Sequence, residues 1–211
     1  MPLVTGVEPQ ARRRDRYNLF LDGAFAMGLH GDLVREAAVA VGRTLRPEDV
    51  RDLAGREAYL TALDTAYRFL AYRPRSEAEV RMRLRRAKVD DITTGVVLAR
   101  LGKQRLLDDS SFARLWIESR QTHSPRSRRV VQWELRRKGV NQEIAEEAAC
   151  DIDDEEAAYR AGAARARHSR ETDYDAFRKR LGDFLVRRGF GYGIARRTVD
   201  CLWQERGEEK P

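Results

Sequence analysis

The sequence predicts a mainly α-helical protein, in which three tandem three-helix repeats of about 50 residues form an elongated array after a small N-terminal β-hairpin region. Three observations predict this fold class. A sixteen-residue segment recurs 51 residues later, and a weaker copy follows 50 residues beyond. Apolar residues recur at helical spacing in and around each copy. Near the N-terminus, residues alternate around an Asp-Gly pair, a strong hairpin signal.

The hairpin is expected around Asp22-Gly23. Residues 17–21, just before this pair, alternate as the side chains of a strand do. A type I′ turn needs the positive φ angles that Asp and Gly tolerate. A lone hairpin is marginal in water, so we expect it to lean on the helices that follow. The basic lead-in, residues 12–16, either touches an anionic partner or guards a solvated strand edge. A short helix is expected to begin at Pro47.

The repeat is the most informative feature of the chain. Residues 74–89 and 125–140 are identical at eight of sixteen positions without a gap, and both begin with Pro-Arg-Ser. Ser76 and Glu79 form a capping box at the start of the first helix, and Ser127 holds the equivalent cap position. The second and third copies end on Gly139 and Gly189, which suit a left-handed C′ residue. Lys88 replaces glycine in the first copy, so we expect a less sharp helix end there.

Each repeated middle helix carries one apolar stripe, and further helices precede and follow it. The stripes of the middle helices are Val80, Leu84 and Ala87; Val131 and Leu135; and Leu181 and Leu185. In the first repeat the stripe of the next helix is expected to be Ile92, Val96 and Ala99. The expected segments are the N-terminal region 1–57, repeats 58–106, 107–153 and 154–207, and a tail 208–211. Each repeat gains stability by stacking on its neighbours.

Charge indicates a binding function. The formal net charge is +7, and most of the cations are arginines that gather on the middle helices and their flanks. Such an excess predicts attraction to phosphates or to an acidic protein surface. On the first middle helix, Arg81, Arg85 and Lys88 lie opposite the apolar stripe. The helix after Gly139 is acidic, and this argues against a helix-turn-helix that reads bases in the major groove.

The sequence argues against a catalytic site, a membrane span and a metal site. The three histidines, His30, His123 and His168, are far apart without ligand spacing, so we expect no metal site and no cofactor. Gly189 to Gly193 resembles a nucleotide loop but follows a helix rather than a strand. Cys150 and Cys201 are isolated, which fits a reducing compartment. With no membrane span and no targeting segment in view, we expect a cytoplasmic binding protein that is not an enzyme.

The middle of the chain resembles the RecX family of bacterial regulators, which bind and inhibit the RecA recombinase. The resemblance covers roughly residues 59–206 and rests on the order and spacing of several segments: 71–77, 107–113, 134–140, and Phe184-Leu185 with Arg188-Gly189-Phe190. The sequence departs from the family pattern at Ser124-Pro125, where a linker glycine is usual, and at Lys88. Both departures affect helix boundaries rather than charge.

The resemblance implies three tandem three-helix modules and a role as a negative modulator of RecA. It implies docking in the groove of the RecA–single-stranded-DNA filament or capping of its end, which limits ATPase, strand exchange and co-protease activity in recombination and the SOS response. The expected partners of this monomer are the RecA filament and DNA, single-stranded first and double-stranded as a further candidate. The alternative is a RecA-independent, sequence-nonspecific nucleic-acid-binding protein.

Helix geometry, rather than the family pattern, selects the residues expected to contact RecA and DNA. They are the aligned arginines of the three repeats: Arg75, Arg81, Arg85, Arg126, Arg128, Arg136, Arg187 and Arg188. Their expected role is charge-assisted contact with acidic groups and DNA phosphates. The neighbouring pairs Arg85-Arg86 and Arg136-Arg137 occur in both strong copies, so some of these side chains could serve packing within the protein instead.

Overall fold

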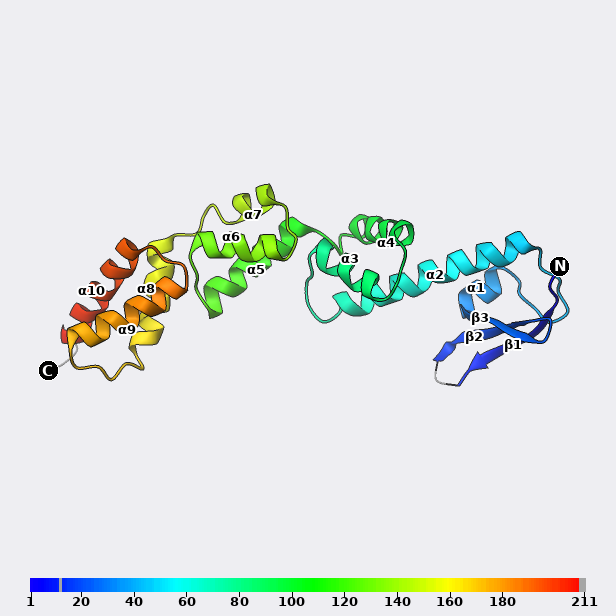
Figure 1. The fold of residues 1–211 in the computed structure, drawn as a ribbon, viewed down its shortest axis with the longest axis horizontal. Helices are drawn as coiled ribbons and strands as arrows, with labels where there is room; N and C mark the ends of the chain where they lie inside the picture. Colours follow the sequence, from blue (N-terminus) through cyan, green and yellow to red (C-terminus); the bar gives the residue numbers. More distant parts are fainter. Residues whose placement is uncertain (12, 209–211) are drawn as a thin grey trace. The chain divides into compact units, whose positions relative to one another are not determined.

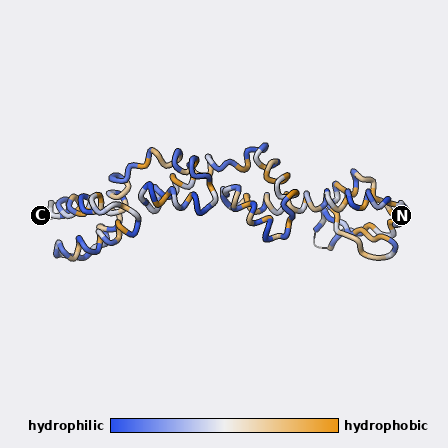
Figure 2. The backbone as a smooth tube through the Cα atoms, turned by 45° about the horizontal axis from the view of Figure 1, so that its top comes forward, coloured by the Kyte–Doolittle hydropathy of each residue, from blue (hydrophilic) through white to orange (hydrophobic). Residues whose placement is uncertain are grey.

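The computed structural model describes residues 1–11 and 13–208, which form three strands and ten helices (Figure 1). Arg12 of the basic lead-in and residues 209–211 of the expected tail lie outside the described residues. The chain divides into two compact units, residues 1–74 with 80–106, and residues 75–79 with 107–211. Hydrophobic and hydrophilic residues alternate along the helices (Figure 2), as expected where each helix buries one face.

The N-terminal region is a three-stranded antiparallel sheet in the order β1-β2-β3. Its strands are β1 (Val4–Gln10), β2 (Arg13–Leu21) and β3 (Ala24–His30). Asp22 and Gly23 have φ angles of 49° and 82°, which confirms the predicted hairpin turn between β2 and β3. The strand β1 was not expected from the sequence. It lies at the sheet edge, where Pro9 is tolerated.

Two helices cover this sheet, α1 (Gly31–Glu36) and α2 (Pro47–Leu70). Leu19 and Leu29 are fully buried in a core to which α2 contributes Leu53, so the hairpin packs against the following helix as expected. The helix begins at Pro47 as predicted, but the expectation of a short helix was wrong. It runs for 24 residues, without a break at the boundary expected between residues 57 and 58.

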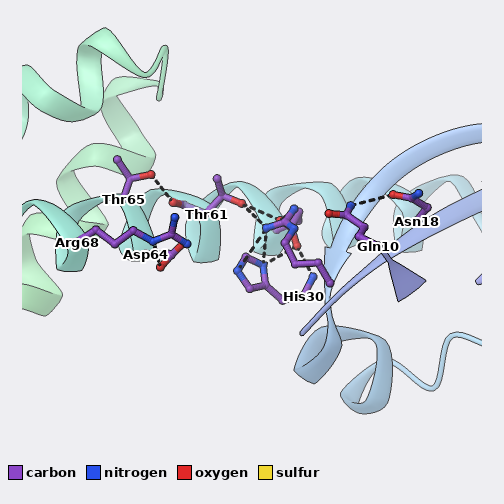
Figure 3. A network of polar contacts seen from close by, with 9 residues as sticks. Gln10, Asn18, His30, Thr61, Asp64, Thr65 and Arg68 are labelled. Carbon is purple, nitrogen blue, oxygen red and sulfur yellow. Dashed lines mark hydrogen bonds and ion pairs between the residues drawn. The ribbon is translucent and has the colours of Figure 1, made fainter. Parts of the chain in front are cut away.

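A buried polar network joins the sheet to α2 (Figure 3). Glu57 accepts a hydrogen bond from Arg16 Nη2 at 2.7 Å through Oε1, and from the backbone N–H of His30 at 2.8 Å through Oε2. His30 Nδ1 lies 2.9 Å from the same Oε2, and the hydroxyl of Thr61 donates to Oε1 at 2.7 Å. Arg16, the last cation of the basic lead-in, is therefore held inside the protein.

Eight helices follow the N-terminal region, and each repeated middle helix lies between two others. The first repeat combines the second half of α2 with α3 (Glu77–Arg86) and α4 (Asp91–Lys103). The others contain α5 (Asp109–His123), α6 (Arg128–Arg137) and α7 (Gln142–Ala148), then α8 (Asp154–Ala166), α9 (Tyr174–Arg187) and α10 (Tyr192–Glu208). The predicted stripes of α3, α6 and α9 are buried, namely Val80 with Leu84, Val131 with Leu135, and Leu181 with Leu185.

Two parts of the predicted stripes are wrong. Ala87, just beyond α3, is exposed. On α4, Ile92 and Val96 are 83% and 52% exposed, while the buried face consists of Thr94, Val97, Leu98 and Leu101. The residues 96–99 are all apolar, so helical spacing fits either face of α4, and only the packing against α2 decides between them.

The caps of the middle helices confirm two predictions and correct a third. Glu79 N–H donates to Ser76 Oγ at 3.2 Å while Ser76 N–H donates to the Glu79 carboxylate at 3.3 Å, which is the predicted capping box. Ser127 Oγ accepts from the N–H of Val130. Lys88 adopts a φ of 60°, and its helix ends with the same six-residue hydrogen-bonded turn as those at Gly139 and Gly189. The expectation of a less sharp end at Lys88 was therefore wrong.

No helix in the part of the chain that the structure describes combines the length and the apolar character that a membrane span requires.

Candidate arginine-rich interface

The middle helices bury one face and expose arginines on the other. Five of the eight predicted contact residues are exposed, and the remaining three are partly buried. The exposed residues are Arg81, Arg85, Arg128, Arg136 and Arg187, and the partly buried ones are Arg75, Arg126 and Arg188. The eight side chains thus divide into two structural classes.

Three of the exposed arginines lie at the C-terminal ends of their helices. Within residues 1–11 and 13–208, no ion pair or hydrogen bond holds the guanidinium of Arg85, Arg136 or Arg187. A cation in the last turn interacts favourably with the helix dipole, which contributes about 0.3–1 kcal/mol at an exposed site. Each side chain is exposed, so its guanidinium can form charge-assisted hydrogen bonds with a carboxylate or a phosphate.

Arg188, by contrast, is engaged within the protein. Its Nη1 donates to Ser124 Oγ at 2.9 Å and to the carbonyl of Pro125 at 3.0 Å, and its guanidinium stacks over the ring of Phe184. Burial, helped by the nearby positive charge of Arg126, lowers the pKa of Arg188 below its ordinary value. Arg188 therefore connects the third repeat to the loop before α6, and its Nη1 is used within the protein.

Arg126 belongs to a cluster around Glu134, a carboxylate that is only 9% exposed. Glu134 Oε2 accepts hydrogen bonds from Trp116 Nε1 at 3.0 Å and Arg120 Nε at 2.8 Å. Arg126 Nη1 lies 3.2 Å from the other carboxylate oxygen. This cluster ties α5 to α6, and it assigns Arg126 a structural contact that helix spacing alone does not reveal.

Arg128 connects the start of α6 to the end of the second repeat by hydrogen bonds. Its Nη2 donates to the carbonyl of Ile152 at 2.6 Å, and its backbone N–H donates to Asp154 Oδ1 at 2.7 Å. The acidic helix α7 follows α6 after a short turn, and Glu143, Glu146 and Glu147 on it are exposed. Its carboxylates therefore face solvent.

A recurring contact joins the start of one middle helix to the end of the next. Ser76 Oγ donates to the carbonyl of Lys138 at 2.5 Å, and a Cβ on Gly139 would overlap that of Ala78. In the second instance, the backbone N–H of Ser127 donates to the carbonyl of Arg188 at 3.2 Å, and a Cβ on Gly189 would overlap Val130. We call these two contacts the Ser–Gly junctions.

Comparisons with known proteins identify the family. The Regulatory protein RecX N-terminal domain matches residues 2–46, and the first, second and third three-helix domains of RecX match residues 62–101, 108–148 and 153–199. A protein named Regulatory protein RecX from Amycolatopsis mediterranei is 34% identical over 161 residues, which are 75% of this chain and 92% of that protein. The chain belongs to the RecX family.

Other relatives extend the similarity to the whole chain. A Regulatory protein RecX from Lactobacillus gasseri is 27% identical over 213 residues, which cover 100% of this chain and 78% of that protein. A crystal structure of regulatory protein RecX has the same fold, with a TM-score of 0.66 at 19% identity, and the match covers 95% of this chain and all of that one. A RecX structure from Lactobacillus salivarius matches with a TM-score of 0.56 at 22% identity over 71% of this chain and 97% of that one.

In this member of the RecX family, the exposed surface includes residues that sequence reasoning did not select. Trp133 on α6 is 46% exposed, and the guanidinium of Arg137 stacks over its ring at 4.7 Å from the centroid. Arg86 and Arg129 are also exposed. A helical projection of α6 could have found Trp133, because it lies opposite the Val131–Leu135 stripe in a position where a tryptophan is unusual. Within the described ranges, no three His, Cys, Asp or Glu side chains gather as metal ligands.

Glu134 is expected to stabilise the second repeat. Replacing Glu134→Ala removes the acceptor of Trp116 and the counter-charge of Arg120 and Arg126, so we expect the free energy of unfolding to fall by about 2 kcal/mol. The loss is limited because both arginines keep about a third of their side-chain surface in water. Urea unfolding followed by circular dichroism measures it. Glu147→Ala, an exposed carboxylate, is the control, and equal midpoints for the two variants would contradict the assignment.

Proposed function

We propose that this RecX-family protein is a cytoplasmic, monomeric negative modulator of RecA. It binds the RecA–single-stranded-DNA filament, by docking in the groove or capping the end, and so limits ATP hydrolysis, strand exchange and co-protease activity in recombination and the SOS response. It acts by binding rather than by catalysis. Family membership supports the regulatory role. The observation that carries the binding proposal is that Arg85, Arg136 and Arg187 are exposed and have no ion-pair partner among residues 1–11 and 13–208.

The arginines have the chemistry that such a filament requires. A guanidinium offers several N–H donors in a planar fork that matches a phosphate or a carboxylate. An exposed arginine that is already ion-paired must first give up its partner, whereas an unpaired one binds without that cost. Of the proposed contact residues, Arg85, Arg136 and Arg187 are therefore the strongest. Arg75, Arg81 and Arg128 are secondary candidates, while Arg126 and Arg188 are proposed to position the surface rather than to contact the partner.

Titration of the protein into a RecA ATPase assay on single-stranded DNA tests this function. We expect inhibition well below one copy per RecA subunit, because a cap or a groove ligand affects many subunits. The triple variant Arg85→Ala, Arg136→Ala and Arg187→Ala should need about tenfold more protein for the same inhibition. Full ATPase activity at every concentration of wild-type protein below DNA saturation would contradict the proposal.

A matched control separates specific contacts from net charge. Arg35, Arg68 and Arg178 are also exposed, but each is paired with an aspartate one helical turn away. The variant Arg35→Ala, Arg68→Ala and Arg178→Ala removes the same three positive charges, and we expect it to inhibit RecA as the wild type does. Equal losses in the two triple variants would show that only net charge matters.

The second candidate function is RecA-independent, sequence-nonspecific coating of nucleic acid. The excess of arginines on a chain of net charge +7 favours it. Coating requires enough protein to cover the strand. For each phosphate contacted on a single strand, the logarithm of the binding constant falls by about 0.7 for every tenfold increase in salt concentration. Inhibition that appears only near saturation of the DNA, with this salt dependence, would support coating over filament binding.

A further inference from the structure

The most unusual side chain on the exposed face of α6 is Trp133. Arginines lie one helical turn before it and one turn after it, at Arg129 and Arg137, and both are exposed. The guanidinium of Arg137 stacks over the indole, so the ring is held in place while about half of its surface stays in water. Within the described ranges, neither arginine is held by an ion pair. An exposed aromatic ring between two available cations therefore marks α6.

The same arrangement recurs in the first repeat. Met82 occupies on α3 the position that Trp133 occupies on α6, and the two side chains are 48% and 46% exposed. Each is followed, three and four residues later, by two exposed arginines, Arg85-Arg86 and Arg136-Arg137. A single exposed apolar residue needs no explanation, but the same exposed apolar position beside the same pair of arginines in two repeats is less easily attributed to chance. The third repeat lacks it, because Asp183 and Val186 replace the apolar residue and the first arginine.

We propose that the exposed faces of α6 and α3 are base-stacking sites for single-stranded nucleic acid. The indole of Trp133, and less strongly the thioether of Met82, packs against a base, while the adjacent guanidiniums contact the phosphates on either side. One helical turn is about 5.4 Å, so Arg129 and Arg137 can reach phosphates that flank a base on Trp133. Aromatic side chains in a basic surface bind single strands in this way, because every base has a π-face.

Single-stranded rather than duplex nucleic acid fits this surface. In a duplex the faces of the bases are stacked on one another, and a protein reaches only their edges in the grooves. An acidic protein partner would engage the arginines but gives no reason for a planar indole between them. The inference rests on the proposed function, because it names the DNA strand of the filament as the ligand of α3 and α6. The third repeat has no part in this stacking.

Binding of the full-length protein to a fluorescently labelled oligothymidylate, without RecA, tests the inference by anisotropy. Trp133→Ala should weaken binding about tenfold, the loss of one stacked base. Trp133→Phe should restore most of the affinity, and Met82→Ala should cause a smaller loss. Leu115→Ala is the control, because Leu115 is 48% exposed in the same repeat but lies outside this face. Thermal unfolding midpoints equal to the wild type verify that the variants fold.

Each outcome decides between specific alternatives. If Trp133→Ala binds oligothymidylate as the wild type does, or weakens binding to a duplex of equal length to the same degree, the stacking site is excluded. If the variant keeps its DNA affinity but loses inhibition of the RecA ATPase, the face binds protein instead, and the inference fails while the proposed function survives. If wild-type protein leaves RecA active but Trp133→Ala loses binding to the single strand, the proposed function fails and the stacking site stands.

Discussion

Replacing Gly189→Ala is expected to lower the free energy of unfolding by about 4 kcal/mol. Gly189 has a φ of 91°, and a left-handed backbone conformation costs a residue with a Cβ about 1–2 kcal/mol. The new Cβ would also overlap Val130 Cγ2 and approach Ser127 Oγ to 2.5 Å, so the start of α6 must move away from the end of α9. Overpacking of this kind costs about 1–3 kcal/mol. Urea unfolding followed by circular dichroism measures the change.

Two other glycine positions provide the controls. Gly182 lies inside α9, and nothing lies within 4 Å of a Cβ placed there, so Gly182→Ala should stabilise the protein by about 0.5–1 kcal/mol through helix propensity. Gly139→Ala meets Ala78 in the first Ser–Gly junction and should be as damaging as Gly189→Ala. If Gly189→Ala and Gly182→Ala unfolded at the same urea concentration, the close approach at the junction would be irrelevant to stability.

The Ser–Gly junctions explain a pattern that the sequence shows without its reason. Pro-Arg-Ser begins the first and second copies, and glycine ends the second and third. In the structure, the serine of each Pro-Arg-Ser donates a hydrogen bond to the carbonyl of the residue just before the glycine of the following copy. From the sequence, these glycines are explained by the left-handed turn alone, yet Lys88 makes the same turn at a φ of 60°. Gly139 and Gly189 are therefore needed chiefly because another helix packs where their Cβ would be.

The fold was predictable where local chemistry decides it. The Asp22-Gly23 turn, the serine caps and the buried stripes of α3, α6 and α9 follow from short-range rules of turn geometry, capping and periodicity. The unexpected strand β1 contains Gly6 and Pro9 and only two valines, so no alternation marks it, and pairing with β2 stabilises it. The face of α4 and the full length of α2 also depend on contacts with distant residues rather than on neighbouring sequence.

The candidate site was predictable in kind but not residue by residue. Arginine clustering and its place opposite the apolar stripes indicated a cationic surface, and exposed Arg85, Arg136 and Arg187 match that pattern. Adjacent arginines nevertheless differ, because Arg187 is exposed while Arg188 reaches Ser124 and Pro125, more than 60 residues away in sequence. Helical spacing cannot distinguish them. Trp133 was not selected, because it belongs neither to the arginines nor to the apolar stripes.

The second large effect is expected at Glu57, whose carboxylate holds Arg16 and His30 against α2. The Glu57 and Arg16 side chains are only 11% and 13% exposed. Burial by itself would raise the pKa of Glu57, but hydrogen bonds from His30 and Thr61 outweigh it, so the pKa lies below the usual 4.5. The contribution of the carboxylate to stability is therefore fully present above pH 4.5 and is lost as pH falls through the lower pKa of the folded state.

Replacing Glu57→Ala should lower the free energy of unfolding by about 3 kcal/mol at neutral pH, because Arg16 loses its counter-charge in a site with little water. Glu57→Gln imitates the protonated carboxyl, so its deficit relative to the wild type should shrink as pH falls below 4.5. Asp64→Asn is the matched control on the same helix, since its exposed ion pair with Arg68 contributes less than about 1 kcal/mol. A deficit for Glu57→Gln that stays constant from neutral to acidic pH would show that the ionised carboxylate does not stabilise the contact between α2 and the sheet.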